Sequence, residues 1–116
     1  MDRSKNSPSP ARVLPITAQE LKTLRESGGP HELVDVRTEN ERALACIDGS
    51  RLFDQQAMDY LQDLERDTLL VFQCHHGIRS QRAAQHFLGL GFSNVRNLVG
   101  GIDAWSLEVD PSVPRY

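Results

Sequence analysis

The sequence predicts an α/β domain built on a parallel β-sheet. Short, mostly apolar runs at residues 33–36, 68–72 and 95–99 have the length and composition of buried strands. Segments with helical periodicity and helix-capping residues lie before, between and after these runs. Because strands and helices alternate at connection lengths that suit right-handed crossovers, consecutive strands are expected to run parallel.

The first predicted helix begins at a capping box. Thr17 and Glu20 have the three-residue spacing at which each side chain satisfies the backbone N–H of the other. Ile16 and Leu21 occupy the two positions of a hydrophobic staple around this box. The helix is expected to end at residues 28–30, because Gly-Gly-Pro cannot continue it.

Two further helices are predicted in the first half of the chain. Thr38 and Glu41 repeat the capping-box spacing and predict a helix over residues 39–45. Asp54 has the side chain of an N-cap, and apolar residues recur at helical steps over residues 57–64. The first of these helices would follow the predicted strand at residues 33–36.

The run at residues 68–72 is the strongest strand signal, and its nearly continuous apolar character places it at the centre of the sheet. It leads directly into the segment 74–80. An apolar stripe at residues 83–88 then predicts a helix that ends at one of the following glycines. Residues 102–105 begin a short final helix, which Pro111 cannot continue.

Composition and charge exclude several classes of protein. The chain has 116 residues, 39% of them hydrophobic, and a formal net charge of −3, which fits one globular domain. No broad cationic field is present, so neither nucleic acid nor an anionic membrane is an expected partner. No apolar stretch approaches the ~20 residues that span a bilayer. The start of the chain lacks a signal-peptide core, so we expect a cytoplasmic protein.

The start of the chain differs in composition from the rest. Residues 1–12 include three Ser and two Pro and supply little apolar surface to bury. We therefore expect a flexible arm over residues 1–12 and a single domain over residues 13–116.

The segment after the central strand carries the candidate chemistry. In open α/β sheets, ligands bind where strand ends lead into helix N-termini, and Cys74 lies at such a place. Gly77 lets the loop curl until several N–H groups point at the sulfur, which favours the thiolate. Arg79 can add a positive charge there. The alternative is an inert, buried thiol at the end of a strand.

Three separated segments resemble the rhodanese-like domains, which are sulfurtransferases that carry a persulfide on one cysteine. The resemblance covers residues 13–105. Residues 33–37 are similar to the family's Asp-Val-Arg strand end, and residues 74–80 to its Cys-x-x-Gly-x-Arg-Ser loop. Residues 91–105 are similar to its closing Gly-Phe and Gly-Gly-x-x-x-Trp elements.

This resemblance implies a five-stranded parallel sheet with helices on both faces, and it implies that Cys74 is the nucleophile and Arg79 a catalytic partner. Asp35 and Arg37 would support the site or face the substrate, although a strand-end ion pair explains them equally well. The anion-binding cradle would consist of the other loop residues: His75, His76, Gly77, Ile78 and Ser80.

The implied reaction is a thiosulfate sulfurtransferase reaction that requires no metal or organic cofactor. The donor would be a small sulfur compound such as thiosulfate or a persulfide, and the acceptor cyanide, a thiol or a partner protein. Residues 109–116 are similar to the ends of rhodanese domains fused to sulfur-activating enzymes, which favours a protein acceptor.

The chain departs from the family where Gly-His-Ile is usual, because Cys46 replaces the histidine. Two interpretations are open: a small half-buried thiol that fills the histidine's place, or a thiol that resolves a modified Cys74. Cys46 and Cys74 match neither a redox pair nor a zinc site in their spacing, so both are expected to be free.

A metal site at Cys74 with His75 and His76 is not expected. Consecutive side chains should diverge, and no further Cys or His cluster completes a tetrahedral shell. The two histidines are interpreted as loop-lining residues that tune the choice of substrate.

Two other functions share this architecture. A cysteine phosphatase or arsenate reductase also surrounds an oxyanion with a thiolate and an arginine. Phosphatases that resemble this fold have five residues between Cys and Arg, whereas only four separate Cys74 from Arg79. The other alternative is a sulfur-relay or protein-interaction module with little turnover of small molecules. A pure interaction module would need neither Cys74 nor Arg79, so the presence of both argues against it.

We predict that deleting residues 1–12 leaves folding and activity intact, because this segment supplies no core. The thermal midpoint and the thiosulfate sulfurtransferase rate of the truncated and full-length proteins should agree closely. A large loss of stability on truncation would show that the arm packs on the domain.

Overall fold

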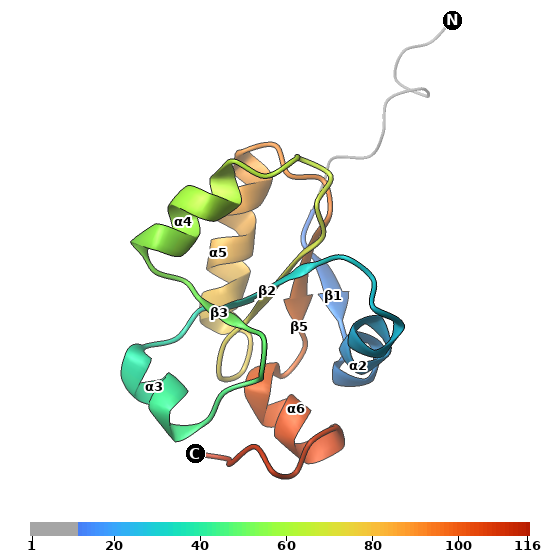
Figure 1. Cartoon of the computed structure of the whole chain (residues 1–116), viewed down its shortest axis with the longest axis vertical. Coiled ribbons are helices and arrows are strands. Elements are labelled where there is room, and N and C mark those ends of the chain that lie inside the picture. The colour runs from blue at the N-terminus through green and yellow to red at the C-terminus, as the bar shows by residue number, and fades with distance from the viewer. Residues whose placement is uncertain (1–11) are drawn as a thin grey trace, which may run out of the picture.

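The computed structural model describes residues 12–116 and contains one parallel five-stranded sheet (Figure 1). The strand order is β1-β5-β4-β2-β3, so the strongly apolar strand β4 is central, as predicted. The α/β class and the parallel sheet are confirmed, whereas the predicted arm falls almost wholly outside the described residues. The strands are β1 (Leu14–Ile16), β2 (Glu32–Asp35), β3 (Arg51–Leu52), β4 (Leu70–Gln73) and β5 (Val95–Leu98).

Five helices connect and follow these strands, and the first three begin at the capping residues read from the sequence. Thr17 and Thr38 each form a complete capping box, with Glu20 and Glu41 respectively. Asp54 accepts a hydrogen bond from the Ala57 N–H at 2.8 Å. The helices are α2 (Ala18–Ser27), α3 (Glu39–Leu44), α4 (Gln55–Gln62), α5 (Ile78–Gly89) and α6 (Gly101–Glu108).

Side-chain alternation along β4 divides the core into two layers. Val71 packs with α2 and α6 on one face of the sheet, whereas Leu70 and Phe72 pack with α4 and α5 on the other. Figure 1 shows these helix pairs apart from each other. Trp105 of α6 is 7% exposed and belongs to the first layer, so it is a core residue. Helices therefore cover both faces, as the family resemblance implied.

Two strands, β1 and β3, could not be recognised from the residues alone. They form the two edges of the sheet and contain only three and two residues. Such segments are too short for a periodicity signal. β1 also contains Pro15, which has no N–H to donate, and an edge strand tolerates such a residue. Only the family resemblance led to the correct number of strands.

The start of α6 packs directly against the loop that follows β4. The Ile102 N–H donates to the Cys74 carbonyl at 2.8 Å, and the Asp103 N–H donates to the His75 carbonyl at 3.3 Å. Gly101 makes this approach feasible, since a Cβ on it would lie 2.3 Å from the Cys74 oxygen. Its φ of +60° also lies in the region that favours glycine.

Every helix within residues 12–116 is too short or too polar to cross a membrane.

We predict that Gly101→Ala strongly destabilises the protein, because the new Cβ would collide with backbone atoms that cannot move aside. The expected loss is about 3 kcal/mol or more, measured as the free energy of unfolding in urea. Gly89→Ala is the matched control, because Gly89 is helical and has no neighbour within 4 Å of the added Cβ. Equal stability of the two variants would contradict the prediction.

Candidate active site

The Cys74 sulfur lies at the carboxyl end of the central strand and accepts several hydrogen bonds. The Gly77 N–H donates to Sγ at 3.1 Å and the Ser80 N–H donates at 3.4 Å. The Ser80 hydroxyl lies 3.3 Å from the same sulfur. Because Cys74 is only 1% exposed, these donors replace most of the solvent that would otherwise surround the sulfur.

This environment favours the thiolate form of Cys74. Burial by itself raises the pKa of the thiol, but hydrogen bonds from Ser80, Gly77 and His76 outweigh that effect. The pKa of Cys74 therefore lies below its ordinary value. A lowered pKa provides more of the nucleophilic thiolate at a given pH.

Gly77 and Asn97 determine the shape of the loop. Gly77 precedes α5 with a φ of +107°, a conformation that residues with a side chain rarely adopt. Asn97 on β5 donates to the Gly77 carbonyl at 2.9 Å and accepts from the Ser80 hydroxyl at 2.6 Å. One hydroxyl proton serves one acceptor at a time, so Asn97 and Cys74 share the Ser80 proton.

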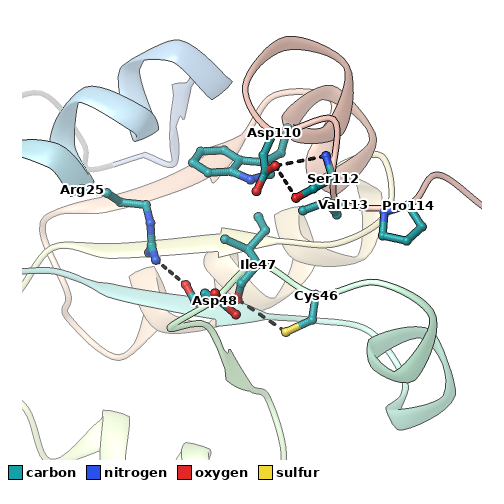
Figure 2. A pocket seen from close by; sticks show the side chains of 9 residues that line it. Arg25, Cys46, Ile47, Asp48, Asp110, Ser112, Val113 and Pro114 are labelled. Carbon is teal, nitrogen blue, oxygen red and sulfur yellow. Dashed lines mark hydrogen bonds between the residues drawn. The ribbon is translucent and has the colours of Figure 1, made fainter.

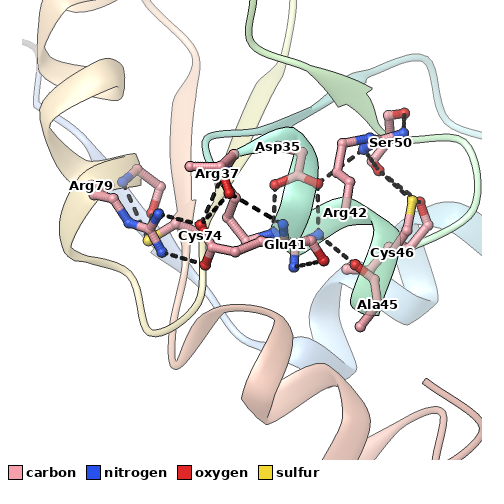
Figure 3. A network of polar contacts seen from close by, with 12 residues as sticks. Asp35, Arg37, Glu41, Arg42, Ala45, Cys46, Ser50, Cys74 and Arg79 are labelled. Atoms are coloured by element: carbon pink, nitrogen blue, oxygen red, sulfur yellow. Dashed lines mark hydrogen bonds and ion pairs between the residues drawn. The ribbon is translucent and has the colours of Figure 1, made fainter. Parts of the chain in front are cut away.

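Arg79 lies beside Cys74 at the rim of the loop but pairs with Glu41 of α3 (Figure 3). Its two terminal nitrogens donate to the two carboxylate oxygens at 2.7 and 2.9 Å. These hydrogen bonds raise the pKa of Arg79, and the Cys74 sulfur adds a smaller electrostatic contribution. The positive charge expected at the loop thus has a counter-ion that was not foreseen.

Asp35 and Arg37 form a bidentate ion pair beneath the site. Both of its hydrogen bonds measure 2.7 Å, and neither side chain is exposed. Arg42 also donates to Asp35, at 2.9 Å, so two arginines neutralise this buried carboxylate. The contacts agree with the strand-end ion pair considered from the sequence. The pair also reaches the site, because Arg37 donates to the Tyr116 hydroxyl at 3.0 Å.

His75 and His76 stack on each other, so the expectation that their side chains diverge is wrong. Their ring centroids are 3.9 Å apart, and Tyr116 stacks on His75 at 4.0 Å with an angle of 10° between the rings. His75 thus lies between two rings, whose stacking shields flat apolar surface from water. Ile78, in contrast, is 72% exposed.

The structure brings a third potential metal ligand, Asp103, to the two histidines. Ligand atoms of His75, His76 and Asp103 all lie within 4.8 Å of one another. One feature disfavours an ion there. Arg115 already binds the Asp103 carboxylate, at 2.8 and 3.3 Å. The absence of a metal requirement stays a prediction.

Cys46 lines a cavity of about 240 Å³ beside the 110–114 segment (Figure 2), and Ser50 links it to Arg42 of the polar network (Figure 3). Its sulfur is half-buried, 3.4 Å from the Ile47 carbonyl and 3.7 Å from the Ser50 hydroxyl. Both cysteines are free. These surroundings support the interpretation of a small thiol that fills the histidine's place.

Three residues of the site were not identified from the sequence. Glu41 was recognised only as part of a capping box, and Tyr116 only as part of a C-terminal segment. Asn97 could have been noticed, because it is a polar residue within the predicted strand 95–99. Nothing in the local sequence indicated that α3 and the C-terminal segment meet at the loop.

The site defines a class of protein: an α/β domain that holds one buried, hydrogen-bonded cysteine between the end of the central strand and a helix. The chain belongs to the rhodanese-like domain family, because the sequence model of that family matches residues 17–108. The resemblance noted from the sequence is thereby confirmed.

Individual relatives support the same assignment. The chain is 38% identical over 91 residues to thiosulfate sulfurtransferase GlpE of Pseudomonas paraeruginosa, covering 78% of this chain and 81% of that protein. It is 34% identical over 109 residues to adenylyltransferase and sulfurtransferase MOCS3-2 of Zea mays. That match covers 87% of this chain but only 23% of the maize protein.

A solved structure shows the same fold. The chain is similar to a rhodanese-like domain protein from Staphylococcus aureus, with a TM-score of 0.70 and 28% sequence identity. The match covers 90% of this chain and 99% of that one.

We predict that Ser80→Ala raises the pKa of Cys74, because it removes one hydrogen bond to the thiolate. The pH midpoint of Cys74 alkylation by iodoacetamide should move upward by about one unit or less, since Asn97 competes for the same proton. Ser93→Ala, at an exposed position, is the control. A downward shift in Ser80→Ala would contradict this account of the site.

Proposed function

We propose that the protein is a sulfurtransferase that carries a sulfane sulfur on Cys74. The observation that carries the proposal is the convergence of the Gly77 and Ser80 donors on one buried cysteine sulfur. Such a cradle stabilises negative charge on the thiolate and equally on the terminal sulfur of a persulfide. Membership of the rhodanese-like family and the similarity to thiosulfate sulfurtransferases support the same reaction.

The first step loads the cysteine. The Cys74 thiolate attacks the outer sulfur of thiosulfate, a new S–S bond forms, and the S–S bond of thiosulfate breaks. Sulfite leaves with the electron pair, and the enzyme holds Cys74–S–S⁻. Gly77 and Ser80 stabilise this anion, while Arg79 supplies positive charge at the rim.

The second step removes the outer sulfur from Cys74. A nucleophilic acceptor, such as cyanide or a thiolate, attacks the terminal sulfur, and Cys74 leaves as the thiolate from which the cycle began. Thiocyanate or a new persulfide is the product. No net oxidation or reduction of the protein occurs, and the loop residues His75 and His76 would influence the choice of acceptor.

A phosphatase or arsenate reductase is the principal alternative. We disfavour it because only four residues separate Cys74 from Arg79. A phosphate held over the cysteine sulfur needs a loop whose N–H groups form a ring wide enough to enclose it. A sulfur-relay module without turnover of small molecules is the other alternative.

We predict that thiosulfate adds one sulfur atom to Cys74 and to no other residue. Wild-type protein, Cys74→Ser and Cys46→Ser should be treated with thiosulfate, freed of reagent and weighed as intact proteins. Wild type and Cys46→Ser should gain one sulfur, and Cys74→Ser should gain none. Loading of Cys74→Ser but not of Cys46→Ser would overturn the assignment.

A comparison of wild-type protein with Arg79→Ala separates the reaction classes. Arg79→Ala should reduce the thiosulfate rate by the equivalent of about 1.5–3 kcal/mol, as expected for one lost charge-assisted hydrogen bond. An aryl phosphate should remain intact with both proteins. Cys74-dependent phosphate release faster than sulfur transfer would favour the phosphatase. Stable loading without turnover to cyanide or thiols would favour the relay module.

A further inference from the structure

The Glu41 carboxylate has more partners than its ion pair with Arg79. The Tyr116 hydroxyl donates to it at 2.7 Å, and the Thr38 N–H and hydroxyl donate at 3.1 and 3.2 Å. These hydrogen bonds, with those from Arg79 first among them, hold the pKa of Glu41 well below its usual range. Glu41 would therefore keep three hydrogen bonds if Arg79 turned away.

Arg79 is attached less firmly. Its side chain is 45% exposed, and its side-chain hydrogen bonds among residues 12–116 go only to Glu41. An arginine fork fits two oxygens of a small oxyanion as well as it fits a carboxylate. Exchanging one such partner for another costs little at a site open to water.

Arg37 differs in this respect. Its side chain is not exposed, and it binds Asp35, the Ala45 carbonyl and Tyr116. Removing it from Asp35 would leave a buried, uncompensated charge. Of these two arginines beside the loop, only Arg79 can therefore change partners without disrupting the core.

We propose that Glu41 is a positioning residue that holds Arg79 at the rim of the Cys74 loop in the resting protein. The anionic oxygens of an incoming sulfur donor then replace Glu41 as the partner of Arg79, while Thr38 and Tyr116 keep Glu41 in place. This inference rests on the proposed sulfur transfer only for the identity of the donor. When the donor binds, the exchange changes the electrostatic potential that Arg79 and its partner produce at the Cys74 sulfur.

Tyr116 has a defined part in this arrangement. Its hydroxyl accepts from Arg37 and donates to Glu41, so it links the buried ion pair to the exposed one. Its ring stacks on His75, which fixes its position beside the loop. Without the hydroxyl, Glu41 would depend more on Arg79, and the exchange would become harder.

The first test measures Cys74 alone, without any sulfur donor, in a Cys46→Ser background. Glu41→Gln removes the carboxylate charge but keeps a residue that can complete the capping box of α3. Arg79 then lacks a counter-ion and acts more strongly on the sulfur, so the pH midpoint of alkylation should fall by about half a unit or more. Glu39→Gln, an exposed residue of the same helix, should leave the midpoint unchanged.

A double-mutant cycle shows whether Glu41 acts through Arg79. Glu41→Gln should shift the alkylation midpoint less in an Arg79→Ala background than in the wild-type background. An equal shift in both backgrounds, or no shift in either, would overturn the proposal. A purely structural role of Glu41 would lower the thermal midpoint without moving the alkylation profile.

The second test uses thiosulfate turnover. Glu41→Gln should lower the KM for thiosulfate about threefold or more, since Arg79 no longer has to leave a carboxylate, and it should not raise kcat. Tyr116→Phe, which keeps the ring on His75, should raise KM about twofold or more. A raised KM in Glu41→Gln, or a lowered KM in Tyr116→Phe, would overturn the exchange. If wild-type protein transfers no sulfur, the proposed function fails, and the alkylation cycle still decides the role of Glu41.

Discussion

The contact between the start of α6 and the loop after β4 is the constraint on which the site depends. Gly101 has no side chain, so the N–H groups of Ile102 and Asp103 reach the carbonyls of Cys74 and His75. With these carbonyls bound from one side, the N–H groups of the loop are free to face the sulfur. The geometry of the cradle is therefore imposed by helix α6, which begins at Gly101, 27 residues after Cys74.

Electrostatics at the site are organised in two levels of burial. Asp35 and Arg37 form an ion pair whose side chains are not exposed. Arg37 also donates to the Ala45 carbonyl, and separating the pair would leave a buried, uncompensated charge, so the pair stays intact. Glu41 and Arg79 form a second pair at the rim, where water lowers the free energy needed to separate them. Tyr116 links the two levels. The resulting arrangement combines a rigid foundation with one cation that can respond to an anion in the loop.

Much of the fold and part of the site could be predicted from local sequence. The capping boxes at Thr17 and Thr38 and the apolar run of β4 act over a few residues, and each was found where expected. Cys74 was identified because its place after the central strand is itself a local pattern. The edge strands β1 and β3 were missed, since two or three residues carry no periodicity and pairing with a neighbour defines them.

The sequence by itself determined the class of fold, the central strand, the starts of α2, α3 and α4, and the choice of Cys74 as the candidate nucleophile. These features follow from hydrophobic periodicity, capping and backbone freedom at glycine, which depend on neighbours in the chain. Only the tertiary structure decided that Glu41 and not Cys74 binds the Arg79 side chain, and that Tyr116 lies on His75. Those contacts join α3, the loop and the C-terminal segment, and contacts between distant segments arise only when the helices pack on the sheet.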